Sequence, residues 1–146
     1  MAALDNYLHR QARQDIKKRV AVAFVLRPDG KTIARYYTLS QYSAELDAIP
    51  QDTARKLPKY PVVPATLIGR LAVSTAFRGR GLGGLMLMDA LNRCLAGSKH
   101  VASAAVIVDA KDEGTLAFYK KYGFLGLPKI THRLFLPMAT IEKMFS

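Results

Sequence analysis

The sequence predicts an α/β protein in which a central mixed sheet is flanked by helices, and three stretches of the chain support this. Residues 67–95 have the pattern of a buried strand, a glycine-rich loop and a helix, with Gly97 as the stop signal. Residues 20–39 predict a β-hairpin, because the turn-forming sequence Pro-Asp-Gly separates two apolar segments. Residues 104–108 form a continuous apolar run, typical of a strand covered on both faces. At 146 residues, the chain is expected to be a single domain over residues 1–146.

Before the central unit, an amphipathic helix is expected over residues 4–19, with apolar residues on one face and basic residues on the other. The sequence leaves open whether the basic face is only solvated or contacts a partner. Residues 20–26 and 32–39 are the predicted arms of the hairpin. Adjacent side chains in a strand point to opposite faces, so of Tyr36 and Tyr37 we expect one in the core and the other available to a cleft.

The segment between the hairpin and the central strand has a weaker pattern. Residues 43–49 fit a short strand or a helix equally well. Residues 51–64 combine basic side chains with three prolines, which predicts an irregular loop. We expect this loop to form a wall of the substrate site, because it leads directly into the central strand.

The second half of the chain predicts a strand, a helix and two closing strands. The second core strand is expected over residues 100–110. Asp112 is the expected N-cap of the next helix, and Gly123 the residue that ends it. The closing strands are expected over residues 124–127 and 132–136.

The loop after the central strand has the composition of an anion-binding site. Its sequence is Arg78-Gly79-Arg80-Gly81-Leu82-Gly83-Gly84. Glycines let the backbone approach a ligand, the first N–H groups of the helix lack intrahelical acceptors, and the helix dipole and two arginines add positive charge. Pyrophosphate is the ligand that fits best.

Two other phosphate-binding motifs fit this loop less well. A Walker A loop needs Lys and then Ser or Thr after its last glycine, but Leu85 follows Gly84. Three of the glycines have the spacing of a dinucleotide-binding fingerprint. The arginines inside that spacing and the shortness of the chain argue against a Rossmann domain.

Composition and charge narrow the class of protein. Lys and Arg number 22 against 11 Asp and Glu, which gives a net charge of +11. This excess favours a polyanionic partner, nucleic acid before a membrane surface or an acidic protein, with a purely solubilising charge as the alternative. The single cysteine, Cys94, lies among the apolar positions of the central helix and is expected in the core. No apolar run could span a bilayer and no signal-peptide pattern is present, so a cytoplasmic location is expected.

Two motifs resemble those of the GNAT family of acyl-CoA N-acyltransferases. Arg78-x-x-Gly81-x-Gly83, entering a helix from a strand, is similar to motif A of that family, whose loop holds the pyrophosphate of coenzyme A. Residues 118–124, with the sequence Phe-Tyr-Lys-Lys-Tyr-Gly-Phe, are similar to its F-Y-x-x-x-G-F motif.

Five further segments resemble one subfamily, the GNAT toxins of type II toxin–antitoxin modules, which acetylate the amino group of aminoacyl-tRNA. These segments are residues 4–8, 11–12, 36–39, 69–73 and 108–112. The resemblance covers nearly the whole chain and implies the GNAT fold. Such toxins normally have a further segment before the position of Leu4, so the N-terminal strand of that fold is expected to be missing here.

The resemblance implies acetyl-CoA as the cosubstrate. Backbone groups of Leu71 and Val73 would contact the pantetheine arm, and one strand N–H could polarise the thioester carbonyl. The expected cofactor contacts are Leu71, Ala72, Val73, Arg78, Gly79, Arg80, Gly81, Leu82, Gly83, Gly84, Lys111 and Phe118. For Phe118, a place in the core is the alternative.

Tyr119 is the candidate general acid, because a phenol has a proton to give to the leaving thiolate at neutral pH. Tyr122 is the alternative acid. No strong base is predicted, and none is needed for an α-amino group beside an ester, which is far less basic than lysine. His9, His100 and His132 are expected to be non-catalytic, and no spacing of ligand residues predicts a metal.

The tRNA is expected to contact basic side chains near the cleft. These are Lys31, Arg35, Arg55, Lys56, Lys59 and Arg93. The resemblance also implies a homodimer and a neutralising ribbon-helix-helix antitoxin.

The expected function is therefore a toxin that acetylates aminoacyl-tRNA and blocks translation. One alternative is a GNAT enzyme for a small amine or a protein N-terminus, but its acceptor cleft should be acidic and this chain is basic. Another is a nucleic-acid-binding module that retains coenzyme A as a ligand, and the intact Tyr119 argues against it.

Overall fold

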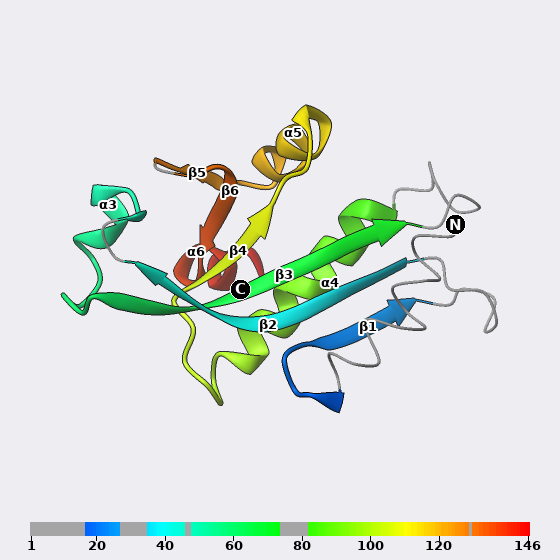
Figure 1. Ribbon diagram of the computed structural model, residues 1–146, viewed down its shortest axis with the longest axis horizontal. Helices are drawn as coiled ribbons and strands as arrows, with labels where there is room; N and C mark the ends of the chain where they lie inside the picture. Colours follow the sequence, from blue (N-terminus) through cyan, green and yellow to red (C-terminus); the bar gives the residue numbers. More distant parts are fainter. Residues whose placement is uncertain (1–16, 27–34, 46–47, 74–81, 129) are drawn as a thin grey trace. The chain divides into compact units, whose positions relative to one another are not determined.

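The computed structural model describes residues 17–26, 35–45, 48–73, 82–128 and 130–146 (Figure 1). The elements in chain order are β1 (Val22–Leu26), β2 (Arg35–Glu45), α3 (Gln51–Ala54), β3 (Val62–Val73), α4 (Leu82–Gly97), β4 (Ala105–Asp109), α5 (Glu113–Lys121), β5 (Leu125–Leu127), β6 (Ile130–Pro137) and α6 (Met138–Met144). The strands form one sheet in the order β1-β2-β3-β4-β6-β5. β1 is antiparallel to β2, and β6 is antiparallel to β4 and to β5. The predicted central sheet with flanking helices is confirmed, whereas the expected helix over residues 4–19 lies almost wholly outside the described residues.

The chain divides into two compact units, the first of which comprises Met1–Ser40 and Ile68–Leu91. In its described part the hairpin of β1 and β2 is present as predicted, with Phe24 opposite Tyr37. Tyr36 and Tyr37 are both buried, so the expectation that one ring would be open to a cleft was wrong. Both faces of β2 are covered at this point, and alternation along a strand sends side chains to opposite faces without exposing either one.

Three contacts made by Tyr37 and Thr38 hold β2 in place in this first unit. The ring of Tyr37 stacks on Phe24 at a centroid distance of 5.3 Å, and its hydroxyl donates a hydrogen bond of 2.5 Å to Asp89 on α4. The Thr38 hydroxyl donates to the Gly69 carbonyl at 2.9 Å. A Cβ atom at Gly69 would lie 2.7 Å from the same hydroxyl oxygen, so the close approach of β2 and β3 requires glycine.

The second unit, Gln41–Leu67 and Asn92–Ser146, has its own core. Ile107 of β4 lies opposite Phe135 of β6, and both side chains are almost completely buried. The cluster around them consists of Ala44, Ile49, Val63, Ala65, Ile107, Leu127 and Phe135. These residues come from most elements of the unit, so their burial holds β2, β3, β4, β5 and β6 together there.

The segment over residues 51–64 was wrongly predicted as wholly irregular. It contains the short helix α3, whose first turn begins after Pro50, and the first residues of β3. Proline is tolerated just before a helix, where its fixed φ is favourable and its N–H is not needed. Pro64 lies within β3, where its carbonyl accepts a hydrogen bond of 2.8 Å from the N–H of Ala104.

Other boundaries also differ from the expectation. β2 continues to Glu45, so the strand alternative holds for the first part of residues 43–49. The second core strand begins only at Ala105 rather than at residue 100. Before it, α4 includes Gly97, and the Ser98 hydroxyl donates to the Leu95 carbonyl at 2.6 Å, so a side chain takes part in ending this helix.

The short helix α6 was not predicted. It starts directly after Pro137, which ends β6, and Ile141 on it is fully buried. The Met138 N–H donates to the Ala104 carbonyl at 2.8 Å, which ties the start of the helix to the residue before β4. Seven residues are too few for helical periodicity to stand out in the sequence.

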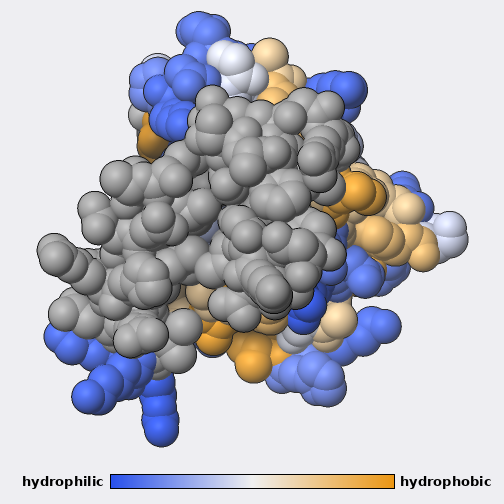
Figure 2. All heavy atoms as spheres, turned by 90° about the vertical axis from the view of Figure 1, so that its right-hand side faces the viewer, coloured by the Kyte–Doolittle hydropathy of each residue, from blue (hydrophilic) through white to orange (hydrophobic). Residues whose placement is uncertain are grey.

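None of the helices in the described part of the chain has the length and apolar composition needed to cross a bilayer. Figure 2 shows hydrophilic and hydrophobic side chains side by side on the face that it draws. Leu85 and Val22 are examples of large apolar side chains that are exposed.

Candidate active site

Helix α5 carries the candidate acid and has well-defined ends. The Asp112 carboxylate accepts a hydrogen bond of 2.7 Å from the N–H of Thr115, which confirms the predicted N-cap. This hydrogen bond from the Thr115 backbone is the main reason why the pKa of Asp112 is lowered from its ordinary value. Gly123 has a φ of +95°, a backbone conformation that favours glycine, and confirms the predicted end of the helix.

Tyr119 lies in a cluster of aromatic rings on α5. Its side chain is only 4% exposed, and its ring contacts Phe118 edge-on at 5.4 Å and Phe124 at 5.3 Å. Phe118 is partly buried and also packs against Tyr122, at 5.2 Å. These contacts fix the orientation of the Tyr119 ring, which is what a positioned proton donor requires.

The expected cofactor contacts fall on several elements. Leu71, Ala72 and Val73 are the last residues of β3, and Leu82, Gly83 and Gly84 are the first residues of α4. The first turn of α4 contains no acidic residue, so nothing there opposes an anion at the helix N-terminus. Residues 78–81 lie outside the described part. Lys111 is exposed in the connection between β4 and α5.

Three of the expected tRNA contacts lie close together in the sequence, after α3. Arg55, Lys56 and Lys59 are all exposed, and Arg55 is 3.8 Å from Asp52 in a solvated ion pair. Lys59 lines a hollow of about 790 Å³, so this segment is the wall of an open cavity. The residues lining the hollow are Glu45, Ile49, Gln51, Ala54, Lys59, Tyr60, Pro61 and Val62.

The other expected tRNA contacts belong to other elements of the chain. Arg93 is exposed on α4, and Arg35 is the first residue of β2. Lys31 lies outside the described residues, as does the side chain of Arg35.

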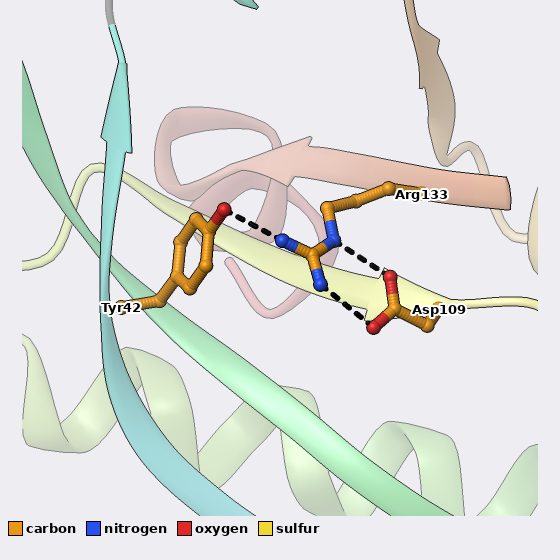
Figure 3. Close-up of polar contacts among 3 residues, drawn as sticks. All are labelled: Tyr42, Asp109 and Arg133. Atoms are coloured by element: carbon orange, nitrogen blue, oxygen red, sulfur yellow. Dashed lines mark hydrogen bonds and ion pairs between the residues drawn. The ribbon is translucent and has the colours of Figure 1, made fainter. Parts of the chain in front are cut away.

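The structure shows one polar cluster that the sequence did not predict: Tyr42, Asp109 and Arg133 (Figure 3). Arg133 of β6 lies directly opposite Asp109 of β4. Its Nε donates to Asp109 Oδ1 at 2.6 Å and its Nη2 donates to Oδ2 at 2.9 Å. Its Nη1 donates to the Tyr42 hydroxyl at 2.6 Å, and the guanidinium carbon is 4.9 Å from the centre of that ring.

This cluster, which we call the Arg133 triad, combines a fixed cation with an accessible anion. The hydrogen bonds to Asp109 raise the pKa of Arg133 above its ordinary value, so the guanidinium stays charged. The Arg133 side chain is 20% exposed and the Asp109 side chain 54%. Asp109 belongs to a segment with family resemblance, but its partners depend on the register of β4 and β6, which the sequence does not reveal.

The remaining candidate residues are the single cysteine and the histidines. Cys94 is buried, as predicted, and burial raises the pKa of its thiol to about 12. His100 and His132 are exposed, and His9 lies outside the described residues. Within the part of the chain that the structure describes, no group of three or more His, Cys, Asp or Glu side chains could hold a metal ion.

Comparison with known proteins decides the family. A family model described as an acetyltransferase (GNAT) domain matches residues 12–125. The chain belongs to the GNAT acetyltransferase family. The resemblance inferred from the glycine-rich loop and from residues 118–124 is thereby confirmed.

Two curated relatives of this GNAT protein are bacterial toxins. The "Probable toxin TacT" of Sinorhizobium fredii is 29% identical over 149 residues, which cover 97% of this chain and 82% of the relative. The "tRNA-acetylating toxin" of Mycobacterium tuberculosis is 34% identical over 122 residues, covering 84% and 72%.

Solved structures of GNAT toxins have the same fold. A tyrosine-to-phenylalanine mutant of KacT has a TM-score of 0.89 at 26% identity, covering 99% of this chain and 87% of that one. AtaT complexed with acetyl-methionyl-tRNAfMet also has a TM-score of 0.89, at 27% identity, covering 100% and 88%. AtaTR bound with acetyl-CoA has a TM-score of 0.84 at 28% identity, covering 100% and 87%. The predicted GNAT fold is confirmed.

Proposed function

We propose that this GNAT protein is an acetyl-CoA-dependent toxin that acetylates the α-amino group of aminoacyl-tRNA and so blocks translation. The observation that carries the proposal is the likeness, over nearly the whole chain, to AtaT in complex with acetyl-methionyl-tRNAfMet. The 34% identity to a tRNA-acetylating toxin supports the same substrate class. We take residues 1–146 as one acetyltransferase domain, because the family match runs through both compact units.

In this proposal acetyl-CoA binds at the end of β3 and the start of α4. Backbone groups of Leu71 and Val73 contact the pantetheine arm, and the N–H groups of the glycine-rich loop hold the pyrophosphate with Arg78 and Arg80. The absence of an acidic residue from the first turn of α4 supports this assignment. A likeness to AtaTR bound with acetyl-CoA supports the choice of cosubstrate.

Acetyl transfer then needs one proton donor. The neutral α-amino nitrogen forms a bond to the acetyl carbon, and the bond from that carbon to sulfur breaks. Tyr119 gives its phenolic proton to the sulfur, and the proton lost by the nitrogen returns to the phenolate through solvent. The fixed ring of Tyr119 supports this role, since a positioned donor loses little freedom on reaching the transition state.

The tRNA and protein partners follow from charge and from the relatives. A net charge of +11 suits a polyanionic substrate, and we assign phosphate contacts to Arg55, Lys56 and Lys59. AtaT forms a complex with the antitoxin AtaR, and we propose a cognate antitoxin of the ribbon-helix-helix class here. A homodimer in the cytoplasm completes the proposal.

The proposal is tested with radiolabelled acetyl-CoA and total charged tRNA, beside the same tRNA stripped of its amino acids. We expect label only in the charged sample, and nuclease digestion then identifies the acetylated amino acid. Absence of label in both samples, with acetyl-CoA binding intact by calorimetry, would move the assignment to a small amine or a protein N-terminus.

A further inference from the structure

We propose that the Arg133 triad binds the aminoacyl end of the acceptor tRNA, with Asp109 accepting a hydrogen bond from the α-amino group and Tyr42 donating one to the ester carbonyl. This inference rests on the proposed function and deepens it, because it names the group that holds the acceptor amine.

The triad is held in one arrangement by three charge-assisted or short hydrogen bonds. Arg133 uses Nε and Nη2 on the two oxygens of Asp109, and Nη1 on the hydroxyl of Tyr42. The planar guanidinium therefore sets the carboxylate and the phenol at fixed positions on either side of itself (Figure 3). Groups from three different strands are arranged in this way before any substrate binds.

Both partners of Arg133 keep unused hydrogen-bonding capacity. A carboxylate has about four acceptor sites, and Arg133 occupies two of those on Asp109. The Asp109 side chain is 54% exposed, so the remaining sites are accessible. The Tyr42 oxygen accepts from Arg133, which leaves its own proton without an acceptor among the residues that the structure describes. The triad thus offers one acceptor and one donor, separated by a guanidinium.

An aminoacyl ester has the complementary pair of groups. Its α-amino group is a donor and its ester carbonyl, two bonds away, is an acceptor. The ion pair of Arg133 and Asp109 is neutral as a whole, so it does not attract phosphates, whereas the free acceptor sites of the exposed carboxylate can bind an amine. The exposed basic side chains of Arg55, Lys56 and Lys59 are suited to bind the phosphates. Because Arg133 already donates twice to Asp109, we assign this carboxylate to binding the amine and not to removing its proton.

The position of the triad in the chain agrees with this role. Asp109 is the last residue of β4, and the next element, α5, carries Tyr119. On the same face of β4 and β6 the neighbouring residues Ile107 and Phe135 are buried and apolar. The triad therefore lies at the polar end of a sheet face that is otherwise apolar. A role in solubility alone would not require a bidentate ion pair at this position.

The decisive experiment compares two dissociation constants for each variant. One is for uncharged tRNA, and the other is for tRNA that carries, on a stable 3′ amide, the amino acid labelled most strongly in the total-tRNA assay. In the wild-type chain we expect the charged form to bind more tightly. Asp109→Asn should reduce that preference about tenfold and Tyr42→Phe about fivefold, as losses of single hydrogen bonds, while the affinity for uncharged tRNA stays unchanged.

Steady-state kinetics give an independent readout. Tyr42→Phe should raise the KM for charged tRNA about fivefold while the Kd for acetyl-CoA stays the same. Thr140→Val is the control, because it removes an exposed side-chain hydroxyl from α6 of the same unit and should change neither constant. Melting temperatures of all variants show whether a loss comes from unfolding.

Three outcomes separate the two proposals. If the wild-type chain acetylates charged tRNA but Tyr42→Phe and Asp109→Asn keep the full preference for the charged form, the triad is only a structural link between strands and this inference is wrong. If the wild-type chain acetylates no charged tRNA, the proposed function and this inference fall together. A lost preference in folded variants supports both.

Discussion

Two arginine–aspartate pairs in the second unit have the same chemistry but different surroundings. Arg133 and Asp109 meet through two hydrogen bonds of 2.6 and 2.9 Å, with side chains 20% and 54% exposed. Arg55 and Asp52 approach only to 3.8 Å, with side chains 74% and 97% exposed.

The difference lies in what each arginine is able to do. A solvated pair at 3.8 Å contributes little free energy and is screened by salt, so Arg55 can exchange Asp52 for a phosphate at little cost. The bidentate, partly buried pair fixes both side chains, so Arg133 organises its neighbours and does not change partner. One pair is thus suited to holding a polyanion and the other to positioning a small polar group.

The largest effect that we expect is a loss of turnover when Tyr119 is replaced. Tyr119→Phe removes the proposed acid and should lower kcat by about 10²- to 10⁴-fold, while the Kd for acetyl-CoA is unchanged. Tyr122→Phe, three residues further on, is the matched control and should keep nearly full activity. Turnover measured with labelled acetyl-CoA checks both, and near-normal activity of Tyr119→Phe would rule out the acid role.

The two ion pairs should also contribute differently to the stability of the folded chain, and this is the next largest effect that we expect. Arg133→Met should lower the free energy of unfolding by about 1–2 kcal/mol, a value already reduced for the solvent exposure of Asp109. Arg55→Met should change it by less than about 0.5 kcal/mol. Urea denaturation with both variants tests this, and equal losses would mean that the geometric difference has no energetic consequence.

The salt dependence of tRNA binding should depend on the exposed arginine, Arg55, and not on Arg133. Replacing Arg55, Lys56 and Lys59 by Gln should reduce the slope of log K against log salt for tRNA binding by roughly 0.7–0.9 for each phosphate that is no longer neutralised. Arg133→Met should leave this slope unchanged. Filter-binding titrations at several salt concentrations measure it, and a slope unaffected by the triple substitution would contradict the phosphate assignment.

The smallest effect that we expect is on the pH dependence of stability, through Asp112, whose carboxylate accepts a hydrogen bond from the backbone. The pKa of Asp112 is lowered in the folded chain, chiefly by the Thr115 N–H. Its contribution to stability is therefore fully present above its unfolded pKa and is lost as the pH falls through the lower folded pKa. Asp112→Asn should lose less stability than the wild-type chain on acidification below the ordinary value of 3.8. Thermal unfolding measured across that range checks the sign.

The sequence predicted those features that depend on nearby residues. The cap at Asp112, the stop at Gly123 and the buried Cys94 each follow from local pattern, and the structure has all three. The helix α3 was missed because prolines beyond its end hid a single turn.

The Arg133 triad could not be predicted, for a different reason. Its members are 24 and 67 residues apart along the chain, and only the register of β4 on β6 and the place of β2 in the sheet bring them together. The same is true of the Tyr37 hydroxyl, whose partner Asp89 lies on α4, 52 residues further along the chain. Local pattern identifies elements, whereas partners across a sheet depend on the tertiary fold.

The buried thiol of Cys94 has a practical consequence. The thiol of Cys94 is buried, and burial raises its pKa to about 12, so it holds little thiolate, which is the form that reacts with alkylating reagents. Since Cys94 is the single cysteine of these 146 residues, we expect little labelling of the folded chain by maleimide reagents. A second cysteine placed on the surface, for example by Lys120→Cys on α5, is therefore a unique attachment point for a fluorophore or spin label, and can report on α5 while tRNA binds.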